Sequence, residues 1–361
     1  MKKIVHIVGT RPNYVKAAPV INAINFGTQT IINTGQHYDK SLSADIIQSL
    51  GMRIPDINLK IPTNIGVFER LSHLMEGISK QLLEIKPDIV ILYGDVDSTL
   101  AASLVASRLL IPTAHVEAGL RSFDDTMPEE INRKIVDRLA SLHFVTERSG
   151  LTNLNYEGYS ESVHFVGNTM IDSLVSVTKS DAYRKSSYKN NDNILLTCHR
   201  PFNVDTEAAL QNILKMCQSV DKKIVWPVHP RTAHKMQNSK KLSEAFKNTP
   251  NLDLIEPLDY CSFLKMMDTS RLVITDSGGI QEETTYLKIP CLTIRPNTER
   301  PITIEVGSNT LSSFSDVPVY VEMVYKNEYK TCALPPKWDG SASTRIAEEL
   351  LNFRGDIKNG R

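Results

Sequence analysis

The stretch "LLIPTAHVEAGLRS" (109–122) enters a short apolar strand and meets a carboxylate, Glu117, where that strand ends. A second apolar run, "DIVILY" (88–93), precedes it and is followed closely by Asp95. Short apolar runs of this kind alternate along the chain with longer stretches of helical periodicity, which is typical of parallel sheets covered by helices on both faces. The sequence therefore predicts the α/β class, with doubly wound sheets.

The predicted strands form two groups on either side of a polar, Lys- and Ser-rich segment at 178–193. The first group comprises 3–8, 30–33, 88–93, 113–117, 142–146 and 163–166, and the second comprises 194–197, 223–228, 252–255, 272–275 and 291–294. A chain of 361 residues is long enough for two domains. We predict two Rossmann-like domains that face a cleft, at 1–175 and 176–361. The final helix, "STRIAEELLNFRG", either packs on the second domain or crosses back to the first.

The composition argues against several functional classes. Basic and acidic residues balance at 41 each, which gives no reason to expect a nucleic-acid or membrane partner and leaves small anions open. The five cysteines are scattered and have no C-x-x-C spacing, which disfavours both a disulfide framework and a zinc site. The N-terminal apolar run stops at Gly9, too early for a signal peptide, and no apolar stretch approaches about 18 residues. We expect a cytoplasmic protein.

The first predicted strand leads into "GTRPNYVKAAP" (9–19), which offers Arg11 and Lys16 to an anion. The segment is neither a G-x-x-x-x-G-K-[ST] phosphate loop nor a G-x-G-x-x-G fingerprint, so nucleotide hydrolysis and dinucleotide binding are disfavoured. A helix start with two solvated cations is the alternative. The position directly after a strand favours a functional role, because ligands of doubly wound sheets bind at the carboxyl ends of the strands.

Three acidic residues follow strands at the same predicted rim: Asp95, Glu117 and, in "DDTMPEEINRKIVDR", Glu129. Each has a structural alternative: Asp95 as a turn former, Glu129 as a charge that complements a helix N-terminus, and Glu117 as the partner of Arg121 or Arg133. Together with Arg11, Lys16 and Arg133, these carboxylates form a cluster that suits proton transfer beside an anionic leaving group.

The second half of the chain carries a candidate phosphate site in "TDSGGIQEE" (275–283), which follows a strand and enters a helix. The backbone N–H groups of Ser277, Gly278 and Gly279 would lie at the positive end of that helix, and Glu282 is placed to accept from ribose hydroxyls. A capped helix with flexible glycines is the alternative.

Two further strand ends carry histidine beside arginine. They are His199 with Arg200 in "HRPFN" and His229 with Arg231 in "PVHPRT". A lone histidine is usually structural, but two in this setting suggest a wall that binds anions, and neither has the spacing of a metal-binding helix.

These motifs, taken together and in order, resemble the non-hydrolysing UDP-N-acetylglucosamine 2-epimerase family over nearly the whole chain. The resemblance rests on "GTRPNYVKAAP", "TGQH", "KPDIVILYGDVDST", "HVEAGLRS", "PEEINR", "GNTMID", "HRPFN", "PVHPRT", "IEPLDY", "DSGGIQEE" and "NTERP". It implies a GT-B-like fold, a homodimer and a UDP-sugar in the interdomain cleft. It also implies epimerisation at C2 by elimination of UDP to a 2-acetamidoglucal and re-addition of UDP, in the service of surface polysaccharide synthesis, without metal or cofactor.

Carried over position by position, the resemblance and the strand-end pattern give one set of candidate residues. The catalytic candidates are Asp95, Glu117, Glu129 and His199, and the candidates for binding the UDP-sugar are Arg11, Lys16, Arg133, His229, Ser277, Gly278, Gly279 and Glu282. Which carboxylate is the base at C2 and which is the acid stays open.

The chain departs from the family pattern at three positions. The family usually has glutamate where this chain has Asn13, arginine or glutamate where it has Pro201, and glutamate where it has Ile302. These departures, with Asp39, suggest an enzyme that needs no UDP-N-acetylglucosamine as activator and whose pocket near Asn13 and Ile302 takes a modified 2-acetamido sugar. Three alternatives remain: a hydrolysing 2-epimerase that releases the free sugar, a glycosyltransferase, and a UDP-sugar sensor without turnover.

Overall fold

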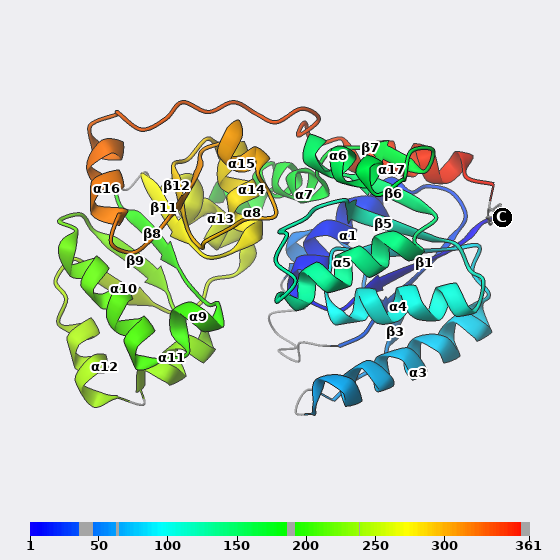
Figure 1. Ribbon diagram of the computed structural model, residues 1–361, viewed down its shortest axis with the longest axis horizontal. Coiled ribbons are helices and arrows are strands. Elements are labelled where there is room, and N and C mark those ends of the chain that lie inside the picture. The colour runs from blue at the N-terminus through cyan, green and yellow to red at the C-terminus, as the bar shows by residue number, and fades with distance from the viewer. Residues whose placement is uncertain (36–45, 63–64, 186–191, 238, 355–361) are drawn as a thin grey trace. The chain divides into compact units, whose positions relative to one another are not determined.

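The computed structural model describes residues 1–35, 46–62, 65–185, 192–237 and 239–354. Asp39 and the side chain of Arg231, both named in the sequence analysis, lie outside the described residues. The chain divides into two compact units, which are treated separately below (Figure 1). The first unit comprises Met1–Val177 and Pro336–Arg361, and the second comprises Thr178–Pro335. No helix within the described residues has the length and the apolar character needed to cross a bilayer.

The first unit is built on a parallel sheet of seven strands in the order β3-β2-β1-β4-β5-β6-β7. Its strands are β1 (Lys3–Val8), β2 (Thr28–Asn33), β3 (Ile57–Asn58), β4 (Ile89–Tyr93), β5 (Thr113–Ala118), β6 (Leu142–Val145) and β7 (Val163–Phe165). The described helices are α1 (Arg11–Ala23), α3 (Val67–Ile85), α4 (Asp97–Arg108), α5 (Pro128–Leu139), α6 (Arg148–Tyr156), α7 (Thr169–Thr178) and α17 (Ala342–Asn352). The reversal of strand order at β1 and β4 makes this a doubly wound sheet.

The second unit has a parallel sheet of six strands in the order β10-β9-β8-β11-β12-β13. Its strands are β8 (Ile194–Thr197), β9 (Ile224–Pro227), β10 (Leu252–Ile255), β11 (Leu272–Thr275), β12 (Cys291–Ile294) and β13 (Asn309–Ser312). The described helices are α8 (Asp181–Lys185), α9 (Pro201–Val204), α10 (Glu207–Ser219), α11 (Pro230–Gln237), α12 (Lys240–Lys247), α13 (Tyr260–Asp268), α14 (Gly278–Leu287), α15 (Ile302–Glu305) and α16 (Val317–Tyr325). The predicted fold class, with two Rossmann-like sheets in one chain, is confirmed.

All the strands predicted from the apolar runs are present, with ends that differ by two residues at most. Two edge strands were not predicted, β3 and β13. β3 has only two residues, and β13 reads "NTLS", so neither offers the apolar run by which a strand buried on both faces is recognised.

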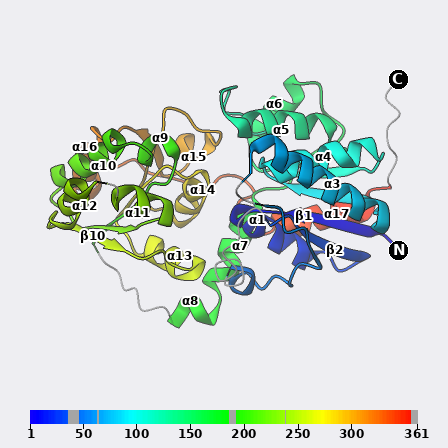
Figure 2. The same ribbon diagram turned by 90° about the horizontal axis from the view of Figure 1, so that it is seen from below.

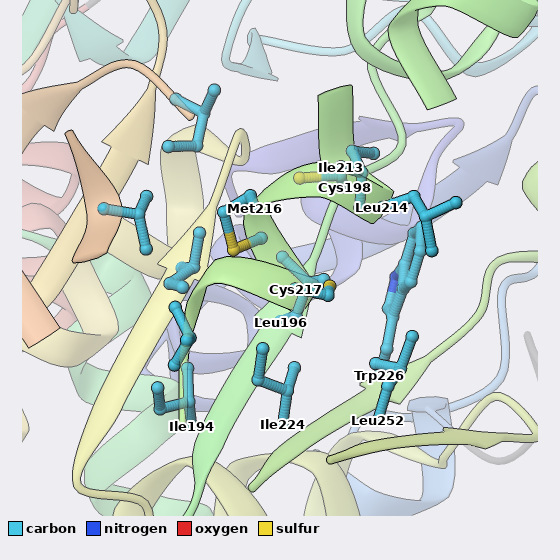
Figure 3. Close-up of a cluster of buried hydrophobic side chains, with 14 of the residues drawn as sticks. Ile194, Leu196, Cys198, Ile213, Leu214, Met216, Cys217, Ile224, Trp226 and Leu252 are labelled. Atoms are coloured by element: carbon cyan, nitrogen blue, oxygen red, sulfur yellow. The ribbon is translucent and has the colours of Figure 1, made fainter. Parts of the chain in front are cut away.

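The core of the second unit forms where α10 packs on β8 and β9. Ile194 and Leu196 of β8 and Trp226 of β9 are fully buried, and Figure 3 shows side chains of α10 pointing toward them. The ring of Trp226 packs edge-on against Phe246 of α12, with ring centroids 5.9 Å apart. Large apolar side chains in such contacts stabilise by about 1.5–3 kcal/mol each when fully buried, so this layer holds the strand ends at fixed positions.

The chain returns to the first unit at its C-terminus. Of the two positions that the sequence left open for the last helix, the structure has α17 in the first unit, packed against α1 (Figure 2). The carboxylate of Asp172 accepts hydrogen bonds from the N–H groups of Ala342 (3.1 Å) and Ser343 (2.7 Å) at the start of α17. Trp338, just before that helix, is buried and donates its indole N–H to the carbonyl of Thr146 at 3.1 Å.

A buried histidine makes the first unit sensitive to acid. His6 on β1 lies between the hydroxyl of Tyr93 (2.8 Å) and Oε1 of Gln29 (2.9 Å). The amide group of Gln29 donates to two backbone carbonyls, which turns its oxygen toward His6 and places a hydrogen on Nε2 of that ring. Burial lowers the pKa of His6 to about 3.

Stability should therefore fall as the pH is lowered below the ordinary histidine pKa of 6.5. The unfolded chain takes up a proton there, whereas folded His6 does so only near pH 3, so unfolding is favoured by about 1.4 kcal/mol per pH unit within this window. We expect the parent to lose about 2 kcal/mol more than His6→Gln between pH 7 and pH 5, measured by urea unfolding of the first unit. Equal losses would show that folded His6 takes up its proton over the same pH range as the unfolded chain, and would contradict the lowered pKa.

Candidate active site

The candidate site in the first unit begins at the carboxyl ends of three adjacent strands. β1, β4 and β5 are parallel neighbours, so the segments that follow them reach one edge of the sheet. Arg11 and Lys16 lie on the helix after β1, Asp95 follows β4, and Glu117 lies near the end of β5. The sheet order therefore brings these four residues, predicted from strand ends alone, to a common rim.

Glu117 is the extra residue of a β-bulge in β5. The pairing of β5 with β6 steps from Val116 to Ala118, and Glu117 has a φ of 78°, in the left-handed region that residues other than glycine rarely adopt. The residue is buried, at 6% exposure, and its Oε2 forms an ion pair with Nζ of Lys16. Backbone strain of this kind costs about 1–3 kcal/mol and is concentrated at functional sites.

Lys16 is almost completely buried in the first half of α1. Its ammonium group lies so close to Gly94 that a Cβ at that position would be only 2.8 Å from Nζ. Gly94 also has a φ of 63°, so the turn after β4 needs glycine for two separate reasons. The sequence analysis placed Lys16 beside a diphosphate, and its pairing with Glu117 was not anticipated.

Asp95 is held by Arg133 of α5, a residue that the sequence analysis assigned to the UDP-sugar. The guanidinium group is 3% exposed, and it contacts Oδ2 of Asp95 with one nitrogen and Oε2 of Glu130 at 2.5 Å with another. Glu130 also accepts from the N–H groups of Ser122 (2.8 Å) and Phe123 (3.1 Å). Burial alone would raise the pKa of Glu130, but the hydrogen bond from Ser122 and the charge of Arg133 hold it below its usual value.

Two candidate residues of the first unit lie outside these pairs. Glu129 is half-buried in the first turn of α5, and Arg11 is exposed at the start of α1. Neither forms a hydrogen bond or an ion pair with another of the described residues. Both side chains are therefore available to a ligand in a way that Lys16 and Arg133 are not.

The sequence analysis missed the buried polar face of α5. Glu130, Arg133 and Asp137 are all buried, whereas Ile131 on the same helix is 46% exposed. The only signal in the sequence is spacing, because positions 130, 133 and 137 share one face of a helix. Hydrophobicity does not identify this face, because Val136 is buried beside the polar residues while Ile131 is exposed.

Asp137 is the centre of a second buried network on this face. Its carboxylate binds Nδ1 of His115 at 2.6 Å and NH1 of Arg121 at 2.7 Å. Arg121 also forms an ion pair with Glu157 at 2.8 Å. Burial by itself would raise the pKa of Asp137, but the charges of His115 and Arg121 lower it below its ordinary value.

Asn13, where the sequence suggested an altered sugar pocket, is buried and hydrogen-bonded within the first unit. It is 2% exposed, its Oδ1 accepts from the N–H groups of Gly9 (3.2 Å) and Thr10 (3.1 Å), and its Nδ2 donates to the carbonyl of Tyr93 at 2.8 Å. It thus caps α1 and ties the end of β1 to the end of β4. Ile302 in the second unit is also buried, at 8% exposure.

In the second unit, His199 and His229 lie together after β8 and β9, with ring centroids 6.3 Å apart. The fully buried carboxylate of Asp276 accepts from the backbone N–H of His199 at 3.1 Å and lies 3.3 Å from its Nδ1. Pro201 occupies the first position of the short helix α9, where its missing N–H costs nothing. Asp276 was not among the predicted residues, although it stands directly before "SGG".

Ser277, Gly278 and Gly279 open α14 as predicted, with Ser277 as the N-cap residue and β11 just before it. A Cβ at Gly278 would lie 2.8 Å from NH1 of Arg300, so the glycine allows a guanidinium group to approach the helix start. Glu282 is 1% exposed and forms an ion pair with Nε of Arg300 at 2.9 Å. The N–H of Ser277 donates to Oγ1 of Thr275 at 3.0 Å, so the half-buried start of α14 offers the N–H groups of Gly278 and Gly279 beside the guanidinium group of Arg300, an arrangement suited to phosphate.

A cavity of about 360 Å³ in the second unit lies away from these residues. Its lining includes Ser270 and Arg271 before β11 and Lys288 and Pro290 before β12. It therefore lies at the amino ends of the strands, at the opposite edge of the sheet from Ser277. Ligands of doubly wound sheets bind at the carboxyl ends, so we do not include this cavity in the candidate site.

Comparison with known proteins places the chain among sugar-nucleotide enzymes. The family model described as UDP-N-acetylglucosamine 2-epimerase matches residues 21–351. The UDP-N-acetylglucosamine 2-epimerase of Methanocaldococcus jannaschii is 40% identical over 319 residues, covering 84% of this chain and 87% of that protein. The UDP-2,3-diacetamido-2,3-dideoxy-D-glucuronate 2-epimerase of Pseudomonas aeruginosa is 33% identical over 367 residues, covering 97% of this chain and 100% of that protein.

A solved structure gives the same answer for the fold. The crystal structure of the M. jannaschii UDP-GlcNAc 2-epimerase in complex with UDP-GlcNAc and UDP superposes with a TM-score of 0.87 at 37% identity, covering 97% of this chain and 100% of that chain. The GT-B-like fold implied by the resemblance is thereby confirmed, and so is the resemblance itself. The chain belongs to the UDP-N-acetylglucosamine 2-epimerase family.

Proposed function

We propose that this enzyme interconverts UDP-N-acetylglucosamine and UDP-N-acetylmannosamine, or a closely related pair of 2-acetamido UDP-sugars, for surface polysaccharide synthesis. The observation that carries the proposal is the pair of positioned carboxylates at one rim, Glu117 with Lys16 and Asp95 with Arg133. The family membership and the relatives that act on UDP-sugars support the same activity.

The reaction has two steps, elimination of UDP and its re-addition. In the first, a carboxylate removes the proton from C2, the C1–O bond to the diphosphate breaks, and UDP leaves with the electron pair of that bond. In the second, a proton is delivered to C2 from the opposite face, and the diphosphate oxygen adds back to C1. A weakly acidic C2 proton needs a positioned base, and the departing diphosphate needs fixed positive charge, which are the two kinds of group that the chain provides.

We assign the two kinds of group to different units. The first unit supplies Asp95, Glu117 and Glu129 for proton transfer, with Arg11 available to the diphosphate. The second unit binds UDP through the start of α14 and through the pair His199 and His229. Arg133 and Lys16 act mainly by holding the carboxylates, which revises their sequence-based assignment to the UDP-sugar.

A homodimer and a cytoplasmic location also belong to this proposal. The resemblance to the family supports the dimer, and sedimentation analysis tests it, because a species at the monomer mass of 40.4 kDa would exclude it. All five cysteines lie within the described residues and none forms a disulfide, which is in keeping with a reducing compartment.

Turnover in D2O provides the decisive test. We expect deuterium at C2 of both epimers, because the proposed mechanism breaks that C–H bond and returns a proton from a group that exchanges with solvent. Proton NMR of purified protein with UDP-N-acetylglucosamine would show the loss of the C2 signal and the growth of a UDP-linked product.

The same spectra separate the alternatives. Release of the free 2-epimer would indicate the hydrolysing reaction, and UDP binding with neither epimer nor exchange would indicate a sensor. A parallel sample with a 2,3-diacetamido UDP-sugar defines the substrate, since the P. aeruginosa relative is named for such a compound. Label at carbons other than C2 would exclude the proposed chemistry.

A further inference from the structure

The strained backbone at Glu117 is anchored on both sides by one buried carboxylate. Asp137 accepts through Oδ1 from Nδ1 of His115 at 2.6 Å and through Oδ2 from the N–H of Gly119 at 3.0 Å. His115 lies two residues before Glu117 and Gly119 two residues after it. A left-handed residue persists only where its surroundings over-determine its conformation, and these two bonds fix the chain on either side of the bulge.

His115 extends this clamp to the neighbouring strand. Its Nε2 donates to the carbonyl of Gly94 at 2.9 Å, directly before Asp95. Both ring nitrogens of His115 are therefore engaged, Nδ1 with the carboxylate of Asp137 and Nε2 with the carbonyl of Gly94. One continuous chain of bonds runs from Asp137 through His115 to the turn that carries Asp95.

We propose that Asp137 is a positioning residue for the epimerisation, which sets the orientation of the Glu117 carboxylate and its register with Asp95 through His115 and Gly119. Asp137 touches neither of the two acids with its own side chain in the contacts above. Its effect passes through the backbone of β5 and the turn after β4. The inference rests on the proposed function and names a residue that acts on geometry at the reacting carbon.

A purely structural role for Asp137 is the competing explanation, because it also pairs with Arg121. That arginine donates to Asp137 at 2.7 Å and to Glu157 at 2.8 Å through Nε, and Glu157 is partly exposed. Glu157→Gln is therefore a matched control. It removes the negative charge of one partner of Arg121, and it leaves the hydrogen bonds of Asp137 with His115 and Gly119 in place.

The test compares Asp137→Ala, Asp137→Asn and Glu157→Gln in the full-length enzyme. The asparagine can retain the clamp, with its oxygen toward Gly119 and Arg121 and its NH₂ group toward Nδ1 of a neutral His115 that still donates to Gly94. We expect Asp137→Ala to lower kcat by about 10²-fold and Asp137→Asn to keep kcat within about tenfold of the parental value. The kcat of Glu157→Gln should equal that of the parent. The Kd for UDP, measured by calorimetry, should change less than about threefold in all three.

Several outcomes would overturn the inference. A folded Asp137→Ala variant with parental kcat would show that the geometry at Glu117 does not depend on Asp137. An Asp137→Asn variant as impaired as Asp137→Ala would show that the charge of Asp137, and not its hydrogen-bonded clamp, sets kcat. If Asp137→Ala does not fold, His115→Phe takes its place, and a parental kcat in that variant would likewise refute the proposal. Turnover by the parent tests the proposed function separately, because the inference concerns only the ratio of variant to parent.

Discussion

Replacing Glu117 with glutamine should lower kcat by about 10²- to 10⁴-fold while UDP still binds, which is the range that a positioned acid or base contributes. Glutamine preserves the size of the side chain and can still accept from the ammonium group of Lys16, so the substitution removes proton transfer and also the negative charge that pairs with Lys16, which costs stability. Steady-state kinetics gives kcat, and calorimetry gives the Kd for UDP, which should stay near the parental value because the UDP site proposed here lies in the other unit.

The control for this experiment is another buried carboxylate of the first unit. Asp172→Asn weakens the cap of α17 and should cost about 1 kcal/mol of stability, with kcat unchanged. A Glu117→Gln variant that behaves like Asp172→Asn, less stable but fully active, would assign Glu117 to structure alone. Loss of UDP binding with kcat preserved would likewise contradict the assignment of Glu117 to chemistry.

The fold and the rim of the site could be predicted because they follow from repeating patterns. Strands buried on both faces read as apolar runs, and parallel strands bring whatever follows them to one edge. Asp95 and Glu117 were found in this way without knowledge of their contacts. Ser277 and Gly278 were found in the same way at the start of α14 in the second unit.

The partners of these residues could not be predicted, and the reasons are physical. A β-bulge does not change the hydrophobic pattern of a strand, so the sequence "AHVEAG" did not predict the left-handed backbone of Glu117. The helix α5 turns Glu130, Arg133 and Asp137 inward, and only compensating charge from the rest of the fold makes that burial tolerable. A rule that places apolar residues inside would bury Ile131, which is exposed, and would leave these three charged residues outside.

Asn13 also shows that the contacts of a residue cannot be predicted from its place in the sequence. As a departure from the family pattern it suggested a change in substrate, yet its amide bonds to the backbone of Gly9 and Thr10 after β1 and of Tyr93 at the end of β4. A difference in sequence beside a site is therefore weak evidence for a difference in ligand until the contacts of that residue are known. The choice between UDP-N-acetylglucosamine and a 2,3-diacetamido sugar rests with the NMR experiment.

The second large effect is expected from Lys16→Met. Removing one partner of a buried ion pair leaves an uncompensated charge, which typically costs about 3–5 kcal/mol, and both side chains of this pair are at most 7% exposed. Unfolding of the first unit by urea should therefore shift strongly. The kcat should fall by at least about 10²-fold, because the Glu117 carboxylate loses the contact that orients it.

The double variant Lys16→Met/Glu117→Gln separates stability from chemistry. Removing both charges abolishes the uncompensated carboxylate, so the double variant should recover about 2 kcal/mol or more of the stability that Lys16→Met loses, and it should recover none of the activity. If Lys16 instead served mainly to bind the diphosphate, Lys16→Met would weaken UDP binding by about tenfold or more and leave the unfolding transition where it was, and the second substitution would restore nothing. A coupling energy near zero between the two positions would therefore mean that the ion pair with Glu117 is incidental, and the proposal that Lys16 acts by holding that carboxylate would have to be abandoned.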